Sequence, residues 1–466
     1  ELPAGVQTAD SVEQVISILD GYYADRIKVT DKLTGDNAHK IICHQRMSDE
    51  GTWLLFANTD EKREIQTSIS LPAQTGTKPV ILDLMSGEVF DLPAAFNSGR
   101  IEFDVKFYPA GSLLVMLPDT QIDAKPAPDY LDSGIQLSTG YTTLQLTDKW
   151  SVSLMEQNVI PINDVTLYLD GKMVIQNAPV TKALHQWFYP APEGTPFKAE
   201  YTFEVLNVPE GEIFAAIEVA ENLDRITCNG TEVTPLKSRG EMGAFDPQKS
   251  WKDVNFTKVP LNGLLKKGIN KLVLEGRKFN NITGPGIHSR VENFNDHTPT
   301  EVETVYIIGN FTVVDEDKTK FAIDGIIRTP DHRDLTASGY PFYAGKAGFV
   351  SYMDIDDDMT KGEDRVYLKI NDVKAACIEL YINGEYCGTR YWHPYVFDIT
   401  QYLKTGRNEI KLVAATTLFN LMGPNRIAGI TDELFVSPRT FVDFDNFTEK
   451  YALLPFGIGS ASLIKV

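Results

Sequence analysis

The chain reads Ile378-Glu-Leu-Tyr-Ile-Asn-Gly-Glu-Tyr-Cys-Gly388 and then Phe397-Asp-Ile-Thr-Gln-Tyr-Leu-Lys-Thr-Gly-Arg-Asn-Glu-Ile-Lys-Leu412. Apolar and polar residues alternate from Ile378 to Ile382, which predicts a strand with one buried face. The Asn383-Gly384 pair that follows tolerates positive φ at both positions and favours the two-residue turn of a β-hairpin. We expect a second strand over residues 396–400 and, after a corner at 406–408, a third strand over 409–414.

The same arrangement occurs earlier in the chain. A strand-like run over 226–230 ends in Asn229-Gly230, and a corner at 268–270 leads into another apolar run. Gly284-Pro285 follows the earlier corner at nearly the spacing at which Gly423-Pro424 follows the later one. A spacing that recurs in this way predicts two copies of one structural module.

These motifs resemble the galactose-binding-like jelly rolls of large glycoside hydrolases, including the β-galactosidase and β-glucuronidase group. In overall order the chain is closer to the α-L-rhamnosidase-like family, which Gly339-Tyr-Pro-Phe-Tyr-Ala-Gly345 also resembles. His44-Gln-Arg46, followed by an apolar strand that ends at Asn58, resembles the small β-sandwich after the barrel in those enzymes. The resemblance implies β-sandwiches that accompany a separate catalytic (β/α)8 barrel.

Length and charge narrow the classes of function. The 466 residues correspond to about three domains, and a formal net charge of −20 disfavours nucleic acids and anionic membrane surfaces as partners. No apolar run is long enough for a transmembrane helix, so we expect no membrane insertion. The chain begins with Glu1 rather than Met, which indicates a processed N-terminus or a piece of a longer protein. The four cysteines form no C-x-x-C pair. Cys228 and Cys377 lie in strand-like runs, where we expect small buried side chains, and a Cys377–Cys387 bridge across the Asn383-Gly384 hairpin is the alternative.

The predicted fold class is all-β, with three tandem β-sandwich domains, the last two of them galactose-binding-like jelly rolls. Turn residues recur every eight to twelve positions or so, which is typical of sandwiches. Residues 10–20 have a helical pattern behind an Asp/Ser cap, and we interpret 1–25 as a lead-in segment. The predicted domains are 26–120, the small sandwich; 130–315, the first jelly roll; and 316–466, the second. A polar, Pro-rich stretch at 119–129 marks the first boundary.

The sequence offers no clear catalytic centre. Glycosidases need two carboxylates at a defined separation, and barrel enzymes need alternating strands and helices, which are not apparent here. Glu301-Val-Glu303 places two carboxylates on one face of a strand, and solvent exposure explains them. The acidic run Asp354, Asp356 and Asp358 is either a solvated turn or a set of oxygen ligands for a structural Ca²⁺. Whether this chain is itself an enzyme stays open, although the resemblance implies a glycoside hydrolase as the parent protein.

Aromatic residues in loop-like positions are the candidate carbohydrate-binding residues, because sugars stack their C–H faces on such rings. They are Trp187, Tyr189, Tyr340, Tyr343, Trp392 and His393. The alternative is that these rings are packing anchors within or between domains. We favour the anchor for Trp392, since the corresponding stretch of the first module, Lys237 to Trp251, has no Trp-His-Pro.

The resemblance implies a non-catalytic accessory region, structural or carbohydrate-binding, of a bacterial glycoside hydrolase that is secreted, periplasmic or at the cell surface. Its partners would be an oligosaccharide or polysaccharide of plant or host origin and an upstream catalytic barrel. Two alternatives are a complete glycosidase with a site between sandwiches and a surface glycan-binding protein.

Overall fold

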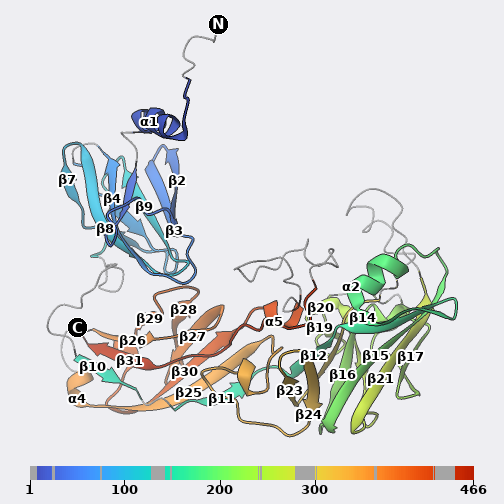
Figure 1. The fold of residues 1–466 in the computed structure, drawn as a ribbon. Coiled ribbons are helices and arrows are strands. Elements are labelled where there is room, and N and C mark those ends of the chain that lie inside the picture. Colours follow the sequence, from blue (N-terminus) through green and yellow to red (C-terminus); the bar gives the residue numbers. More distant parts are fainter. Residues whose placement is uncertain are drawn as a thin grey trace.

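A computed structural model of the chain describes residues 8–23, 27–73, 76–126, 142–146, 149–239, 241, 244–278, 300, 302–360, 365–422, 425 and 447–465. The fold is all-β, as predicted, and its strands form six sheets that pair into three sandwiches (Figure 1). Among the described named strands, every pair is antiparallel except β15 with β24. Each sandwich has its own hydrophobic core.

The small sandwich comes first. One of its sheets has the order β1 (Lys28–Asp31), β4 (Ile65–Pro72), β8 (Arg100–Phe107) and β7 (Ala95–Asn97). The other has the order β2 (Ile41–Ser48), β3 (Gly51–Asn58), β9 (Ser112–Pro118), β5 (Val80–Leu82) and β6 (Val89–Asp91). In β8 every second residue is buried, because apolar and polar residues alternate along it.

The middle sandwich has a five-stranded sheet with the order β12 (Asn158–Ile162), β22 (Val305–Gly309), β16 (Ile213–Glu218), β20 (Asp253–Pro260) and β19 (Ser250–Trp251). Its larger sheet has the order β14 (Lys172–Pro179), β13 (Asp164–Leu169), β15 (Pro196–Asn207), β21 (Gly268–Arg277), β17 (Arg225–Cys228) and β18 (Thr231–Val233). The hairpin of β23 (Thr312–Glu316) and β24 (Lys320–Asp324) attaches to the larger sheet through β15.

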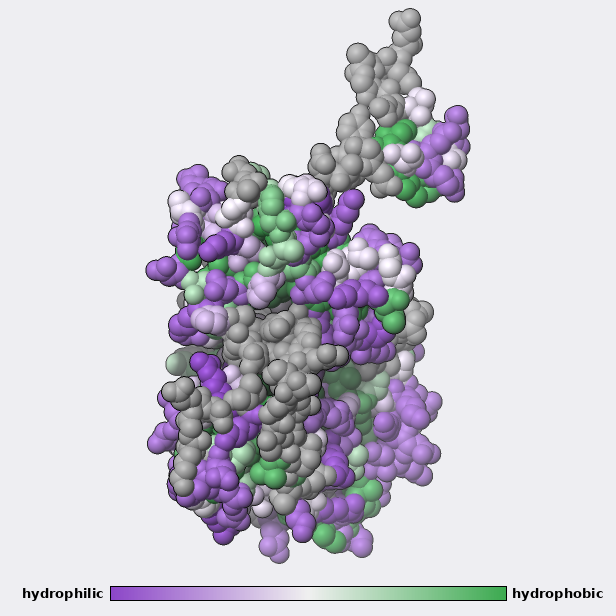
Figure 2. All heavy atoms as spheres, turned by 90° about the vertical axis from the view of Figure 1, so that its left-hand side faces the viewer, coloured by the Kyte–Doolittle hydropathy of each residue, from purple (hydrophilic) through white to green (hydrophobic). Residues whose placement is uncertain are grey.

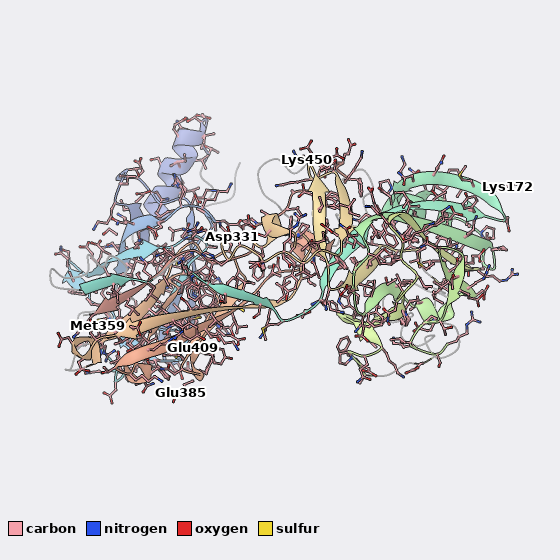
Figure 3. The ribbon with its side chains drawn as sticks, turned by 90° about the horizontal axis from the view of Figure 1, so that it is seen from below. Lys172, Asp331, Met359, Glu385, Glu409 and Lys450 are labelled. Carbon is pink, nitrogen blue, oxygen red and sulfur yellow. The ribbon has the colours of Figure 1, made fainter. Side chains whose placement is uncertain are left out.

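The C-terminal sandwich takes strands from before and after the middle sandwich in the sequence. One sheet has the order β10 (Thr142–Gln145), β31 (Ala461–Lys465), β26 (Val366–Ile370) and β29 (Val396–Asp398). The other has the order β11 (Ser151–Leu154), β25 (Lys346–Ile355), β30 (Gly406–Ala415), β27 (Cys377–Ile382) and β28 (Glu385–Arg390). Figure 3 views the two larger sandwiches side by side, with Lys172 at the far end of the middle one.

The strand pairing differs from the expected domain boundaries. β10 and β11 lie within 130–315, yet they pair with β31 and β25 of the C-terminal sandwich. Conversely, β24 lies beyond residue 315 but pairs with β15 of the middle sandwich. The middle sandwich is therefore inserted into the C-terminal one, between β11 and β25. Backbone pairing between strands far apart in sequence decides this arrangement, and local sequence patterns carry no trace of it.

Both predicted Asn-Gly hairpins are confirmed. Asn383-Gly384 joins β27 to β28, with φ of 53° and 84°, and Asn229-Gly230 joins β17 to β18, with φ of 51° and 88°. Positive φ at both central residues is the geometry of the turn that suits the strand twist. The strand expected over 396–400 is present as β29, which pairs with β26 in the opposite sheet, while the hairpin partner of β27 is β28.

In each module, an equivalent pair of asparagines connects the hairpin to the later corner by a hydrogen bond. In the C-terminal sandwich the Asn383 Nδ2 donates to the Asn408 Oδ1 at 2.9 Å, and the buried Asn408 donates to the carbonyls of Lys404 and Gly406 at 2.7 and 2.9 Å. In the middle sandwich Asn229 donates to Asn270 at 2.8 Å, and Asn270 donates to the carbonyls of Lys266 and Gly268. The repeated sequence motif is thus a repeated hydrogen-bond network.

The predicted N-terminal helix is α1 (Val12–Tyr23), on a segment that projects from the small sandwich (Figures 1 and 2). Its apolar residues Val12, Val15, Ile16 and Leu19 are exposed. The other helical segments are short: α2 (Val180–Ala183), the π-helical turn η1 (Leu184–Phe188), η2 (Ala220–Asn222), η3 (Thr336–Ser338), α4 (Asp357–Thr360), η4 (Thr400–Tyr402) and α5 (Phe419–Met422). No helix in the described part combines the length and apolar character that a membrane span requires. All four cysteines are free thiols, so the Cys377–Cys387 bridge is not formed, and Cys228 is buried.

Candidate functional site

The Trp392 loop, residues 391–395, lies between the C-terminal sandwich and the small sandwich. Arg390 and residues 392–394 line one side of a cavity of about 80 Å³, and residues 81–85 and 112–114 of the small sandwich line the other. Trp392 and His393 are half-buried there. The structure thus puts both residues at a domain interface, which is the place expected of packing anchors.

His393 makes the closest ring contacts of this interface. Its imidazole stacks on Tyr108 of the small sandwich, with ring centres 5.7 Å apart, and meets Tyr395 edge-on at 4.6 Å. Burial lowers the pKa of His393. Glu64 acts in the opposite direction, while the cations Lys106 and Lys369 add to the lowering of this pKa. The neutral imidazole is therefore the form that fits the interface.

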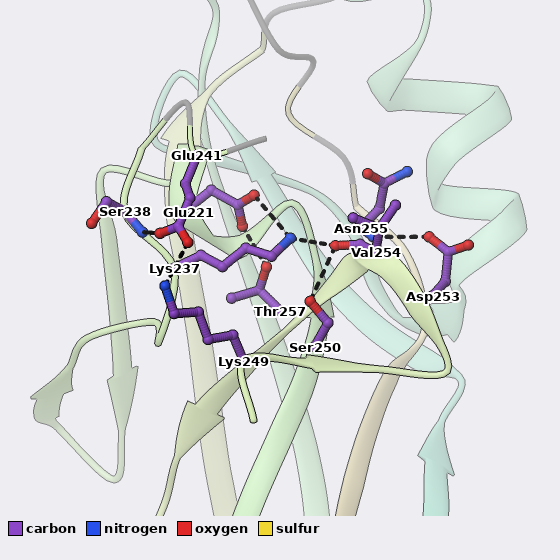
Figure 4. A network of polar contacts seen from close by, with 10 residues as sticks. All are labelled: Glu221, Lys237, Ser238, Glu241, Lys249, Ser250, Asp253, Val254, Asn255 and Thr257. Carbon is purple, nitrogen blue, oxygen red and sulfur yellow. Dashed lines mark hydrogen bonds and ion pairs between the residues drawn. The ribbon is translucent and has the colours of Figure 1, made fainter. Parts of the chain in front are cut away.

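The corresponding stretch of the middle sandwich, Lys237 to Trp251, includes a network of charged and polar contacts (Figure 4). The buried Lys237 ammonium donates to the carbonyl of Val254 and lies 3.7 Å from the Glu221 carboxylate. Thr257 donates to the same carboxylate at 2.5 Å, so both charges have partners. This arrangement fits a fixed corner of the fold.

Tyr340 and Tyr343 do not present their rings to solvent. They are 4% and 2% exposed and belong to the core of the C-terminal sandwich. The Tyr340 hydroxyl donates to the carbonyl of Arg328 at 2.8 Å, and the Tyr343 hydroxyl donates to that of Lys346 and accepts the amide of Glu156. Burial raises the pKa of Tyr343 to about 12. Both rings are thus used in packing, which fits the alternative of packing anchors for these two residues.

Trp187 and Tyr189 are accessible. They are 41% and 38% exposed and flank Phe188, whose buried ring fastens η1 to the core of the middle sandwich. Tyr189 packs edge-on against His185, with ring centres 5.2 Å apart. The buried Lys278 ammonium donates to the carbonyl of Tyr189 at 2.7 Å and fixes the backbone after the helix. Two exposed aromatic rings thus lie on either side of Phe188, which is anchored in the core.

The acidic run around Asp354 lies at the end of β25 and in α4, and its three predicted ligands are all exposed. Among the described residues, no three His, Cys, Asp or Glu side chains are grouped so that they could hold a metal ion. The exposure of all three carboxylates fits the solvated turn. Glu301, Gly284-Pro285 and Gly423-Pro424, which the sequence also singled out, lie outside the described residues.

A groove that the sequence did not indicate lies where the middle and C-terminal sandwiches meet. It has a volume of about 460 Å³. Its lining residues come from β11 to β12, the turn between β22 and β23, the loop after β24, and the segment after η3. They are Val152, Leu154, Glu156, Asn158, Asn310, Phe311, Ile327, Arg328, Thr329, Pro330 and Tyr340. Because these segments come from four parts of the chain, only the tertiary fold brings them together. One local signal was present: the polar residue Asn158 begins a fully buried strand whose other residues are apolar.

Asn158 has an unusual position in the wall of this groove. It is 2% exposed, and its amide nitrogen donates to the carbonyls of Phe311 and Gly339 at 2.9 and 3.2 Å. Its Oδ1 has no hydrogen-bond partner among the described residues. A buried acceptor without a donor costs about 1–3 kcal/mol, so this oxygen favours a ligand or water that supplies one.

No protein-family model matches the sequence, and comparison with curated proteins finds no relative. Among solved structures, a rhamnosidase from Novosphingobium sp. PP1Y is similar over 98% of this chain, with a TM-score of 0.42 and 11% identity. An α-L-rhamnosidase from Streptomyces avermitilis, complexed with L-rhamnose, is similar over 94%, with a TM-score of 0.25 and 10% identity. The chain spans 26% of the length of the first enzyme and 39% of the second. Similarity at these values assigns no family.

Proposed function

We propose that this chain is a non-catalytic accessory region of a glycoside hydrolase, and that its middle sandwich binds carbohydrate. The observation that carries the proposal is the pair of half-exposed rings, Trp187 and Tyr189, on either side of the anchored Phe188 of η1. A ring that is already fixed loses little conformational entropy when a sugar stacks on it. The strongly negative chain has no electrostatic conflict with a neutral glycan.

The proposal includes a structural role for the C-terminal sandwich. The Trp392 loop docks onto the small sandwich through His393 and Tyr108, which supports a region that holds neighbouring domains in place. The parent enzyme's catalytic barrel, proposed from the sequence motifs, would lie upstream. The same motifs support secretion to the periplasm, the cell surface or the medium of a bacterium.

Binding to soluble polysaccharides tests the proposal. We expect the chain to be retarded in native gels that contain arabinogalactan as a largely neutral polysaccharide. Trp187→Ala and Tyr189→Ala should each weaken binding about tenfold, which corresponds to roughly 1.4 kcal/mol of stacking energy. Tyr386→Ala is the matched control, because Tyr386 is an exposed ring on the C-terminal sandwich. Unchanged binding of both middle-sandwich variants, or an equal loss in the control, would contradict a platform on η1.

A further inference from the structure

We propose that the groove between the middle and C-terminal sandwiches is a second carbohydrate site, which takes one neutral sugar ring. This inference rests on the proposed carbohydrate-binding function but concerns residues remote in sequence from Trp187 and Tyr189. The volume of about 460 Å³ lies within the range of roughly 300–1,000 Å³ that is usual for small-molecule sites. The groove also lies at a junction of two domains, where such sites are frequent.

Hydrogen-bonding capacity is the first argument. The Asn158 Oδ1 is a buried acceptor that no described residue satisfies, and a hydroxyl group is a donor that suits it. The amide is held by two bonds to backbone carbonyls, so this acceptor is preorganised. Asn310 and Thr329 add an amide and a hydroxyl to the same groove. A ligand with several hydroxyl groups, each both donor and acceptor, matches this set.

Charge is the second argument. Arg328 is one charged group of the groove, and its guanidinium lies 3.2 Å from the buried Asp324 carboxylate. Glu156 is the other, and the ammonium of Lys252 pairs with its carboxylate. Because each charge already has a partner of opposite sign, the groove offers no net charge to an ionic ligand. A neutral sugar is therefore favoured over a uronic acid or a sugar phosphate.

Apolar surface is the third argument. Val152 and Leu154 are half-buried on β11, and Ile327 is an exposed aliphatic residue of the loop after β24. A pyranose ring has C–H faces and a rim of hydroxyl groups, so it can cover these side chains while its rim reaches the polar groups. A long apolar ligand offers no hydrogen bonds, so it would leave the polar groups of the groove unpaired and lose binding free energy.

The test uses ligand-observed saturation-transfer NMR on the full chain. The probes are methyl α-L-rhamnoside, methyl β-D-galactoside and methyl α-D-glucoside, with D-galacturonate as the anionic probe. Thr329→Trp places a large side chain at the open wall of the groove, and Leu154→Trp fills it from β11. Ile326→Trp is the matched control, because Ile326 is exposed beside the groove but does not line it.

We expect a signal from at least one neutral glycoside. It should fall about fivefold or more in both groove-filling variants and persist in Ile326→Trp and Trp187→Ala, with melting temperatures near that of the parent chain. The inference is overturned if no neutral glycoside gives a signal, if filling the groove leaves it unchanged, or if galacturonate binds better. In each of those cases, polysaccharide retardation that depends on Trp187 could still be observed. The proposal for Trp187 and Tyr189 and the proposal for the groove can therefore be rejected independently.

Discussion

The side chain of Asn408 uses all of its hydrogen-bonding capacity inside the protein. Its nitrogen donates to the carbonyls of Lys404 and Gly406, and its oxygen accepts from the Asn383 amide and the Lys404 backbone at 2.9 and 3.0 Å. A fully satisfied buried amide specifies one backbone geometry, because any other geometry leaves part of it unpaired. Asn270 does the same in the middle sandwich.

We predict that Asn408→Asp lowers the free energy of unfolding of the C-terminal sandwich by about 3 kcal/mol, because the carboxylate faces two carbonyl oxygens with no proton to donate. Urea denaturation followed by fluorescence measures the change. Asn97→Asp, at an exposed position of the small sandwich, is the control and should change stability by less than about 0.5 kcal/mol. Equal small effects at both positions would mean that the network contributes little.

We predict that Trp392→Ala lowers the stability of the unit formed by the small and C-terminal sandwiches by about 2 kcal/mol. The ring is half-buried in the interface, so the loss is below the roughly 3–5 kcal/mol expected for a fully buried Trp. Calorimetric unfolding measures it, and Tyr391→Ala, at the exposed neighbouring ring, should have little effect. A loss of polysaccharide binding without loss of stability would instead identify Trp392 as a sugar platform.

At single positions, the sequence predicted local backbone requirements better than it predicted the tertiary environment of each side chain. The Asn-Gly pairs were predicted because their backbone requirement is local. The sequence left open whether Tyr340 and Tyr343 are exposed or buried, because Gly and Pro around an aromatic residue are typical both of an exposed loop and of a buried turn. Asn158 was missed because its importance depends on Phe311 and Gly339, which lie more than 150 residues away.

At the level of elements, the strands were predictable but some of their partners were not. β27 and β28 are joined by two residues, so the hairpin is encoded locally. β11 pairs with β25, and the paired residues Ser153 and Gly348 are 195 positions apart in the sequence. No local pattern encodes that pairing. The fold class was therefore predictable, while the insertion of one sandwich into another required the structure.

The helix α1 gives a prediction at this level. Val15 and Ile16 are exposed, so they bury little surface when the chain folds. We expect the double change Val15→Ser and Ile16→Ser to alter the unfolding free energy by less than about 0.5 kcal/mol. Leu54→Ala, in the core of the small sandwich, should lower it by about 3 kcal/mol. A large effect of the helix double variant in thermal unfolding would show that this apolar face is covered in solution.

For the whole molecule, the interleaved strands predict which fragments fold. A fragment of residues 316–466 lacks β10 and β11, so the edges of β31 and β25 are left open. Open strand edges promote aggregation. We expect this fragment to be insoluble or to unfold without a cooperative transition, whereas residues 142–466 should unfold cooperatively. Size-exclusion chromatography with thermal denaturation decides, and a stable monomer of 316–466 would contradict the prediction.

The docking of the small sandwich should depend on pH. The pKa of His393 is lowered in the docked state, so that state binds a proton less readily than the separated one. The stabilisation is therefore complete above the ordinary histidine value near 6.5 and declines as the pH falls below it. We expect small-angle scattering to show a more extended molecule at pH 5 than at pH 7.5.

His393→Gln is the variant that tests this pH dependence, because it removes the titrating group. It should make the dimensions of the molecule nearly independent of pH over that interval. His39→Gln, at an exposed turn of the small sandwich, should behave like the parent chain. If the His393 variant expands at low pH as the parent does, protonation of this imidazole does not control docking.

The insertion of the middle sandwich has a consequence for synthesis on the ribosome. Ser153 leaves the ribosome 195 residues before its partner Gly348. At about 5–20 residues per second, this strand waits roughly 10–40 s for its place in a sheet. During that interval the middle sandwich can fold, while β10 and β11 remain without their native partners. The order of translation thus makes these two short strands the part of the nascent chain that most needs protection from mispairing.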